Sequence, residues 1–376
     1  MNAPIPIALL LDGGAYGGTE RHVRDLVLGM GERAPGSFAP ELILAQDGPF
    51  AEAMRGRGIP THIEPRPGAL AYVRGVAARI RAGRYALVHA HSGRLACLGA
   101  RLGGAKTVIE TRHGLIERVN PHYLRRARLA ALEGVKSRLA TRSIAVCAAD
   151  RDWLLAQGGF SARSVVVIRN GIGPVRPSLP SRSAVRERWG IPPAAPLLGF
   201  GGRLVPQKQP ERVLDLFAAL AARHSSVELV LCGDGPLLPA LRSRVSGAPW
   251  GERAQFRGPE ELPDLLAAAD LLLAPSLHEG LPYLLLEAMS IGLPLLATPV
   301  GGVAELLSTP ELEASLADWD LGEWTQRASQ IFTARTLRTT WASAAARRLD
   351  DYRLDAMIDA TLELYRRELG LPPRPR

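Results

Sequence analysis

The sequence predicts an α/β protein of two domains, each with a parallel sheet between layers of helices. Short apolar runs alternate with helical patterns along the chain, and this order is typical of parallel sheets with helices on both faces. The alternation restarts after a stretch rich in proline and serine, residues 174–183. A chain of 376 residues is long enough to bury two hydrophobic cores.

The composition excludes several classes of protein. No apolar run approaches the ~20 residues of a membrane span, and the run at residues 5–11 lacks the preceding basic residues of a signal peptide. We therefore interpret residues 5–11 as a first strand and expect a cytoplasmic protein. The three cysteines, Cys97, Cys147 and Cys232, lie in apolar segments, which favours buried thiols over a disulfide or a zinc site.

The net charge of +9 lies in the amino-terminal half, since residues 1–175 hold 24 Lys and Arg against 13 Asp and Glu. This asymmetry indicates either an anionic partner, such as a membrane surface or a phosphorylated acceptor, or excess arginine that only keeps the chain soluble. Residues 121–142 form a basic amphipathic pattern that could contact the inner face of a membrane or simply cover the sheet. Basic residues are not interleaved with aromatic ones, so we expect no nucleic-acid partner.

The first domain, residues 1–173, begins with a strand and a glycine-rich turn that contains Gly17 and Gly18. Such a turn lets backbone amides approach a phosphate. The G-x-G-x-x-G spacing is not met in any register, which argues against an NAD-dependent oxidoreductase. The later strands of this domain are predicted at residues 41–45, 61–64, 86–89, 107–110, 143–147 and 165–168, with helices at 50–57 and 70–81 between them.

Three histidines lie at or just after the ends of predicted strands of this domain. His89 and His91 lie two residues apart at one strand end, but two ligands without a third make a poor metal site, so we expect no metal there and interpret His91 as lining a cleft. His113 follows the next strand. It could donate a hydrogen bond to a substrate hydroxyl, or it could be an ordinary loop histidine.

The second domain, residues 184–348, follows the linker at 174–183 and repeats the strand and helix order. Its strands are predicted at residues 197–200, 227–231, 255–258 and 271–273. We expect the final helical pattern, at 349–369, to return to the first domain as part of a segment spanning residues 349–376.

The stretch HEGLPYLLLEAM provides the main evidence for a binding site. Glu279 lies in a loop after a buried strand, and we expect Pro282 in the first turn of a helix of roughly three turns. The amides of Gly280 and Leu281 at the positive helix end could bind phosphates. Glu287 lies ~7 Å further along the axis, at ~1.5 Å per residue, where it could accept the hydroxyls of a ribose, while Glu279 could meet a sugar on the far phosphate.

Two cations in another loop, Arg203 and Lys208, suit the same ligand. A guanidinium offers a planar fork to phosphate oxygens and an ammonium a compact charge, so the two could neutralise a diphosphate without a metal. The chain has three lysines in all, and one of them is Lys208. The alternative is that both cations are ordinary residues of a solvated loop.

The motif HEGLPYLLLEAM, with Glu279 and Glu287 separated by seven residues and ATPVGG following, resembles the signature of the retaining glycosyltransferases of family 4. The resemblance covers nearly the whole chain and implies the GT-B fold, two facing Rossmann-like domains with a cleft between them. It further implies that Gly17 and Gly18 face the donor phosphates and that His113 lies near the transferred sugar. It also implies that Arg203 and Lys208 clamp the diphosphate and that the loop at Gly258 holds the nucleobase. The match falters over residues 306–325.

The expected reaction is transfer of a sugar from a nucleotide-diphosphate sugar to a hydroxyl, with retention as the resemblance implies. We expect a glycan or lipid-linked glycan as acceptor and no cofactor. The alternatives are a nucleotide-sugar isomerase or hydrolase of the same fold and a non-catalytic nucleotide-sugar-binding protein. The base, the sugar, the acceptor and the linkage cannot be predicted from these residues.

Overall fold

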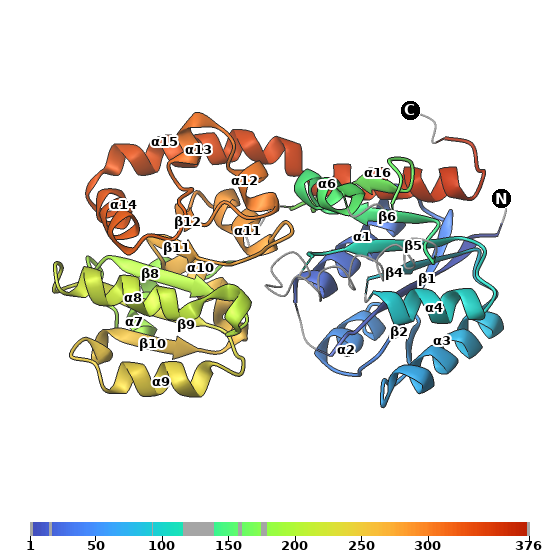
Figure 1. The fold of residues 1–376 in the computed structure, drawn as a ribbon, viewed down its shortest axis with the longest axis horizontal. Coiled ribbons are helices and arrows are strands. Elements are labelled where there is room, and N and C mark those ends of the chain that lie inside the picture. Colours follow the sequence, from blue (N-terminus) through green and yellow to red (C-terminus); the bar gives the residue numbers. More distant parts are fainter. Residues whose placement is uncertain are drawn as a thin grey trace. The chain divides into compact units, whose positions relative to one another are not determined.

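The computed structural model describes residues 3–14, 17–91, 93–115, 139–156, 160–173 and 179–373. The chain forms two compact units. The first unit comprises Met1–Gly171 and Arg353–Arg376, and the second comprises Ile172–Tyr352. In the sequence, the second unit thus lies between the two segments that make up the first unit (Figure 1). Most of the basic amphipathic pattern at 121–142 and half of the predicted linker lie outside the described residues.

The first unit contains a parallel sheet with the strand order β3-β2-β1-β4-β5-β6-β7. Side chains of a strand alternate between the two faces of its sheet, and β1 does so here. Leu9 and Leu11 enter one core cluster, while Ala8 and Leu10 enter the other. The strands are β1 (Ile5–Leu11), β2 (Phe38–Leu44), β3 (Thr61–Ile63), β4 (Leu87–Ala90), β5 (Val108–Arg112), β6 (Arg142–Ala145) and β7 (Val165–Val167).

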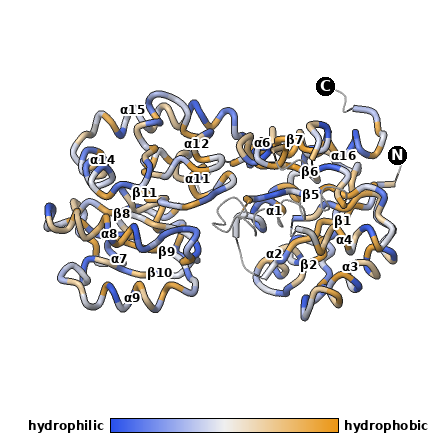
Figure 2. Tube along the Cα trace, in the orientation of Figure 1, coloured by the Kyte–Doolittle hydropathy of each residue, from blue (hydrophilic) through white to orange (hydrophobic). Residues whose placement is uncertain are grey.

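Helices cover both faces of this sheet. The described helices are α1 (Gly18–Arg33), α2 (Pro49–Arg55), α3 (Ala69–Gly83), α4 (Arg94–Leu102), α6 (Ala148–Ala156) and α16 (Leu354–Glu368). Side chains of α1, α2 and α16 enter the core on one face, and those of α3 and α4 enter the core on the other. Hydrophobic and hydrophilic stretches alternate along α3 (Figure 2), as an amphipathic helix requires. The last helix, α16, therefore belongs to the core of the first unit.

The second unit contains a parallel sheet with the order β10-β9-β8-β11-β12. Its strands are β8 (Leu197–Gly201), β9 (Glu228–Cys232), β10 (Ala254–Arg257), β11 (Leu271–Ala274) and β12 (Leu295–Ala297). The helices are α7 (Arg182–Trp189), α8 (Pro210–Ala221), α9 (Leu238–Ser246), α10 (Leu262–Ala268), α11 (Tyr283–Ser290), α12 (Gly302–Leu306), α13 (Pro310–Glu313), α14 (Leu321–Thr333) and α15 (Arg335–Arg348). The predicted α/β class, with two parallel sheets, is confirmed.

The segment at residues 306–325, where the match to the family pattern falters, pairs with the sheet and contains a buried tryptophan. Leu316 forms a parallel bridge with Ala297 at the end of β12. Asp320 caps α14 by accepting a hydrogen bond from the Glu323 amide at 2.7 Å. Trp324, in the first turn of α14, is fully buried in the core, and its ring nitrogen donates to the Asp318 carbonyl at 3.1 Å. No helix among the described residues is long and apolar enough to cross a membrane.

Candidate active site

The loops that follow the strands of the second unit meet at one edge of its sheet, because all its strands run in the same direction. Close backbone packing joins them. Gly233 N donates to Arg257 O at 3.0 Å, and a Cβ on Gly233 would lie 1.9 Å from the Gly202 oxygen. Gly302 N donates to Gly280 O at 2.8 Å, and a Cβ on Gly301 would lie 1.8 Å from the Glu279 oxygen. Only glycine allows these approaches.

Lys208 and Glu279, which come from different loops, form an ion pair at this edge. Lys208 Nζ donates to Glu279 Oε1 at 2.5 Å, with only 21% and 10% of the two side chains exposed. Gln207 joins the same loops, since its backbone oxygen accepts from Leu277 N at 2.8 Å and its side chain donates to His278 O at 2.9 Å. The structure thus brings together two residues that lie 71 positions apart in the sequence.

Arg203 follows β8 in the loop that also carries Lys208, and it is exposed. Its guanidinium pairs with no carboxylate and forms no hydrogen bond with any residue that the structure describes. The loop therefore carries one cation held by a carboxylate and one cation that faces solvent.

The helix after Glu279 is shorter than predicted and starts later. It is α11 (Tyr283–Ser290), about two turns long, and Pro282 is its extended N-cap and not a residue of its first turn. Gly280 and Leu281 therefore precede the cap, so their amides are not the first amides of the helix as we expected. Glu287 lies within α11 and is half-buried.

Gly258 immediately follows β10. The neighbouring Arg257 carbonyl accepts the hydrogen bond from Gly233, which links this loop to the loop after β9. Arg203, Lys208, Gly258, Glu279, Gly280, Leu281 and Glu287 all belong to the second unit, whereas Gly17, Gly18 and His113 belong to the first.

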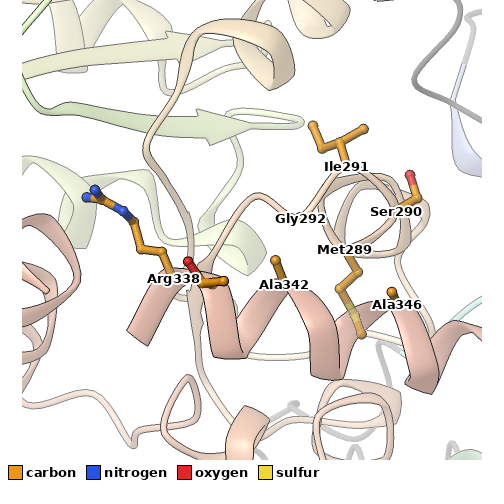
Figure 3. A pocket seen from close by; sticks show the side chains of 8 residues that line it. Met289, Ser290, Ile291, Gly292, Arg338, Ala342 and Ala346 are labelled. Carbon is orange, nitrogen blue, oxygen red and sulfur yellow. The ribbon is translucent and has the colours of Figure 1, made fainter. Parts of the chain in front are cut away.

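A shallow hollow of about 460 Å³ lies at the other end of α11, against α15 (Figure 3). Met289 and Ile291 line it from one side and Ala342 from the other, together with Ser290, Gly292, Arg338, Thr339 and Ala346. The Arg338 guanidinium donates to the backbone oxygens of Ile331 and Phe332 at 3.1 and 3.0 Å. None of the predicted site residues lines this hollow.

In the first unit, Gly17 is the N-cap of α1 and Gly18 is its first residue. The Gly17 amide donates to Glu20 Oε2 at 3.1 Å, which is one half of a capping box. The Gly13 amide donates to the other oxygen of Glu20 at 3.4 Å. Burial of this carboxyl raises the pKa of Glu20 against the lowering effect of the backbone amides. Glu20 therefore already engages an amide of the turn that we expected to bind phosphate.

His113 lies just after β5 and contacts two other histidines. Its Nε2 forms a hydrogen bond with His91 Nδ1 at 3.0 Å, and its ring centroid lies 4.8 Å from that of His22 on α1. His22 Nδ1 bonds Asn170 Oδ1 at 3.1 Å. Burial lowers the pKa of His22 to about 4 and lowers the pKa values of His91 and His113 well below the ordinary range. These three rings are therefore neutral at pH 7.

His89 packs against this group of histidines. It is fully buried, its Nδ1 bonds the Tyr365 hydroxyl at 2.6 Å, and its Nε2 bonds the Thr111 hydroxyl at 2.7 Å. Its ring centroid lies 4.1 Å from that of His91. His22 was not among the predicted site residues, although it lies on the apolar face of α1, where a buried histidine needs a polar partner.

Two family models match the chain. Residues 16–176 match "Glycosyltransferase Family 4" and residues 195–333 match "Glycosyl transferases group 1". D-inositol 3-phosphate glycosyltransferase of Rhodococcus opacus is 27% identical over 364 residues, 89% of this chain and 77% of that protein. 2-Deoxystreptamine glucosyltransferase of Streptomyces kanamyceticus is 31% identical over 217 residues, 56% of this chain and 53% of that protein.

The fold is also found among solved structures. Anabaena Alr3699/HepE, in a crystal structure with UDP and glucose, matches with a TM-score of 0.82 at 21% sequence identity, covering 96% of this chain and 99% of that one. This likeness shows the predicted GT-B fold. The two family matches together span most of the chain, and the chain therefore belongs to the glycosyltransferases of family 4.

Proposed function

We propose that this glycosyltransferase moves a sugar from a nucleotide-diphosphate sugar to a hydroxyl of a glycan or lipid-linked glycan, with retention. The observation that carries the proposal is the cation pair on the loop after β8. Lys208 is held by Glu279 at 2.5 Å and Arg203 is exposed. An anion with two phosphates can engage both cations, because Arg203 offers a planar fork and an ammonium has three donors.

In the proposed complex, Arg203 and Lys208 neutralise the diphosphate as it leaves. The ammonium keeps one hydrogen bond to Glu279 and gives another to a phosphate oxygen, so Glu279 positions the cation while its second oxygen accepts from a sugar hydroxyl. Glu287 accepts the ribose hydroxyls. Charge that develops on the leaving oxygen is stabilised by groups already in place, which lowers the barrier without a metal.

The chemical step breaks the bond between the anomeric carbon and the diphosphate oxygen and forms a bond from that carbon to the acceptor oxygen on the same face. The acceptor proton passes to the departing phosphate oxygen, so no protein base is consumed. His113, which is neutral, gives or accepts a hydrogen bond at a hydroxyl of the transferred sugar. The turn at Gly17 and Gly18 lies toward the donor phosphates in this proposal.

The donor test is a thermal-shift screen of the purified protein against UDP, GDP and ADP sugars, starting with UDP-glucose because HepE was crystallised with UDP and glucose. We expect one donor to raise the Tm of the wild type and of Arg223→Ala, which removes an exposed arginine of the same unit. The Arg203→Ala and Lys208→Ala variants should lose the shift. A shift equal in all four proteins would contradict the diphosphate assignment.

The reaction test separates the alternatives. Donor incubated alone should remain intact, whereas an isomerase would give an epimer and a hydrolase would release free sugar. Addition of an acceptor should yield a glycoside whose anomeric configuration, measured by NMR, equals that of the donor. Phosphorylated cyclitols belong in the acceptor panel, because relatives act on D-inositol 3-phosphate and residues 1–175 carry the excess positive charge.

A further inference from the structure

Three histidines from three separate elements of the first unit converge on one point. His22 comes from α1, His91 follows β4, and His113 follows β5. One ring nitrogen of each lies within 4.8 Å of the other two. The sequence presents only the pair His89 and His91, and the fold replaces His89 with two histidines from elsewhere. His89 cannot take part, because both of its ring nitrogens are bonded to hydroxyls.

One hydrogen bond fixes which nitrogen of His22 faces the cluster. A metal ion binds the neutral imidazole, which has one nitrogen with a lone pair. The Asn170 oxygen can only accept a hydrogen bond, so His22 Nδ1 donates and the lone pair of this ring lies on Nε2. A carbonyl oxygen that fixes the tautomer of a ligating histidine is the usual outer partner at a metal site.

His91 provides a second, independent observation. The residue is 7% exposed, and its Nε2 is buried without a hydrogen-bond partner in the part of the chain that the structure describes. Its Nδ1 bonds His113 Nε2 at 3.0 Å, so one of these two rings donates its proton to the lone pair of the other. A bound ion replaces this hydrogen bond, because both rings can direct a lone pair at the ion only when neither donates to the other. A buried polar nitrogen left without a partner is unfavourable, and a bound ion or its water can satisfy Nε2 of His91.

We propose that His22, His91 and His113 form a site for one divalent transition metal ion of the Zn²⁺ class. Three imidazole ligands with a fourth position for water are sufficient for such an ion. His113 is only half-buried, which leaves a side from which the ion and its water can enter. All three ligands belong to the first unit.

One consequence rests on the proposed function. His113 cannot give a nitrogen to a metal ion and at the same time a hydrogen bond to the transferred sugar from that nitrogen. Binding of the ion therefore withdraws His113 from the donor sugar and inhibits transfer. The ion regulates the enzyme and does not catalyse the reaction.

Metal binding is tested first, without any substrate. Protein stripped with EDTA is titrated with ZnCl₂ by calorimetry, and with Co²⁺ while visible absorption is recorded. We expect one ion per chain and the visible band of a low-coordinate Co²⁺ site. The His22→Gln and His91→Gln variants should bind at least about tenfold more weakly, and Asn170→Ala about 10- to 100-fold more weakly through loss of the outer partner.

His62→Gln is the matched control, because this histidine of the first unit is partly exposed and pairs with Glu41 instead of with the cluster. It should bind zinc as the wild type does. Circular dichroism establishes that each variant is folded. Absence of binding to the wild type, or equal binding to all variants, overturns the proposal; the first result indicates water at His91, and the second an adventitious site elsewhere.

Transfer activity is measured separately. Once a donor has been identified, micromolar Zn²⁺ should inhibit the wild type and His62→Gln, and EDTA should restore both. Zinc binding without inhibition would overturn the regulatory consequence but leave the site intact. If no donor is turned over, the proposed function fails while the binding experiment still decides whether the metal site exists.

Discussion

At the scale of single residues, the ion pair of Lys208 and Glu279 is the feature most directly tied to the proposed chemistry. Each side chain alone would be a largely buried charge without a partner, which is strongly unfavourable, and together they hold both loops in one arrangement. The sequence indicated both residues through their chemistry and the family motif. It did not indicate that they bind each other, because residues 71 positions apart meet only through the order of β8 and β11 in the sheet.

Glu279→Gln tests this pair. The amide keeps the shape of the carboxylate but not its charge, so Lys208 loses its ionic partner and is positioned less well. We expect kcat to fall by about a hundredfold, the size found when one preorganised polar group is removed from a transition state. The measurement is steady-state transfer kinetics. Glu252→Gln, at an exposed glutamate of the same unit, should change neither kcat nor KM, and an unaltered kcat in Glu279→Gln would remove Glu279 from the proposed mechanism.

Glu20 gives a prediction about pH and stability. Burial raises its folded-state pKa above the ordinary value of 4.5, so the folded state holds the proton more tightly than the unfolded state does. The resulting stabilisation is present below pH 4.5 and is lost as the pH rises through the raised pKa. Glu20→Gln lacks this contribution, so the free energy of unfolding of the variant relative to wild type should increase between pH 4 and pH 7.

Urea unfolding at the two pH values measures this difference. Glu32→Gln, at an exposed glutamate of the same helix, is the control and should show the same difference from wild type at both pH values. A Glu20→Gln difference that did not change with pH would show that burial does not perturb this carboxyl.

At the scale of elements, the loops of the second unit depend on glycines that allow two backbones to touch. Gly301 has φ +53°, and a Cβ there would lie 1.8 Å from the Glu279 oxygen. Gly301→Ala must therefore displace the loop that carries Glu279. We expect a loss of stability of about 2–3 kcal/mol together with loss of the donor-induced thermal shift.

Gly190→Ala is the control that distinguishes the effect of backbone strain at a positive φ from the effect of a steric clash with the Glu279 loop. Gly190 ends α7 with φ +68°, but nothing lies within 4 Å of the position of its Cβ. The free energy of unfolding of this variant should fall by only ~1 kcal/mol, the cost of an alanine in the left-handed conformation, and the variant should keep the thermal shift. Equal losses in the two variants would show that the contact with Glu279 has no effect beyond backbone conformation.

The sequence predicted strands better than helix boundaries. Short continuous apolar runs located most strands, because burial on both faces of a parallel sheet leaves a strong signal. The predicted start of α11 was wrong because proline is found both just before a helix and in its first turn, and the residues around Pro282 do not distinguish the two positions. The histidine cluster could not be predicted either. His22 and Asn170 are 148 positions apart, and His89 and Tyr365 are 276 apart, so only the assembled unit brings each pair together.

At the scale of the whole molecule, α16 completes the core of the first unit although it follows the entire second unit in the sequence. Its side chains Met357, Ile358, Leu362, Leu364 and Tyr365 are buried there, and Tyr365 bonds His89. A chain that ends at Tyr352 should therefore lose the protection of the first sheet while the second unit stays folded. Amide hydrogen exchange measures the protection of the backbone amides in each unit separately and so tests this prediction.

A chain that ends at Gly370, just after α16, is the matched control and should exchange as the full chain does. The second unit should be equally protected in all three proteins, since its own core contains no side chain from α16. Full protection of β1 and β4 in the chain that ends at Tyr352 would contradict the dependence of the first unit on its last helix.

The insertion of one unit within the other also sets an order of events during synthesis. Domains usually fold in the order in which the ribosome makes them. Here the residues of the second unit are complete at Tyr352, whereas the amino-terminal unit must wait for a helix translated after them. The face of the first sheet that α16 covers thus stays incomplete until this helix has been translated, so the unit that begins earlier in the sequence reaches its native state later.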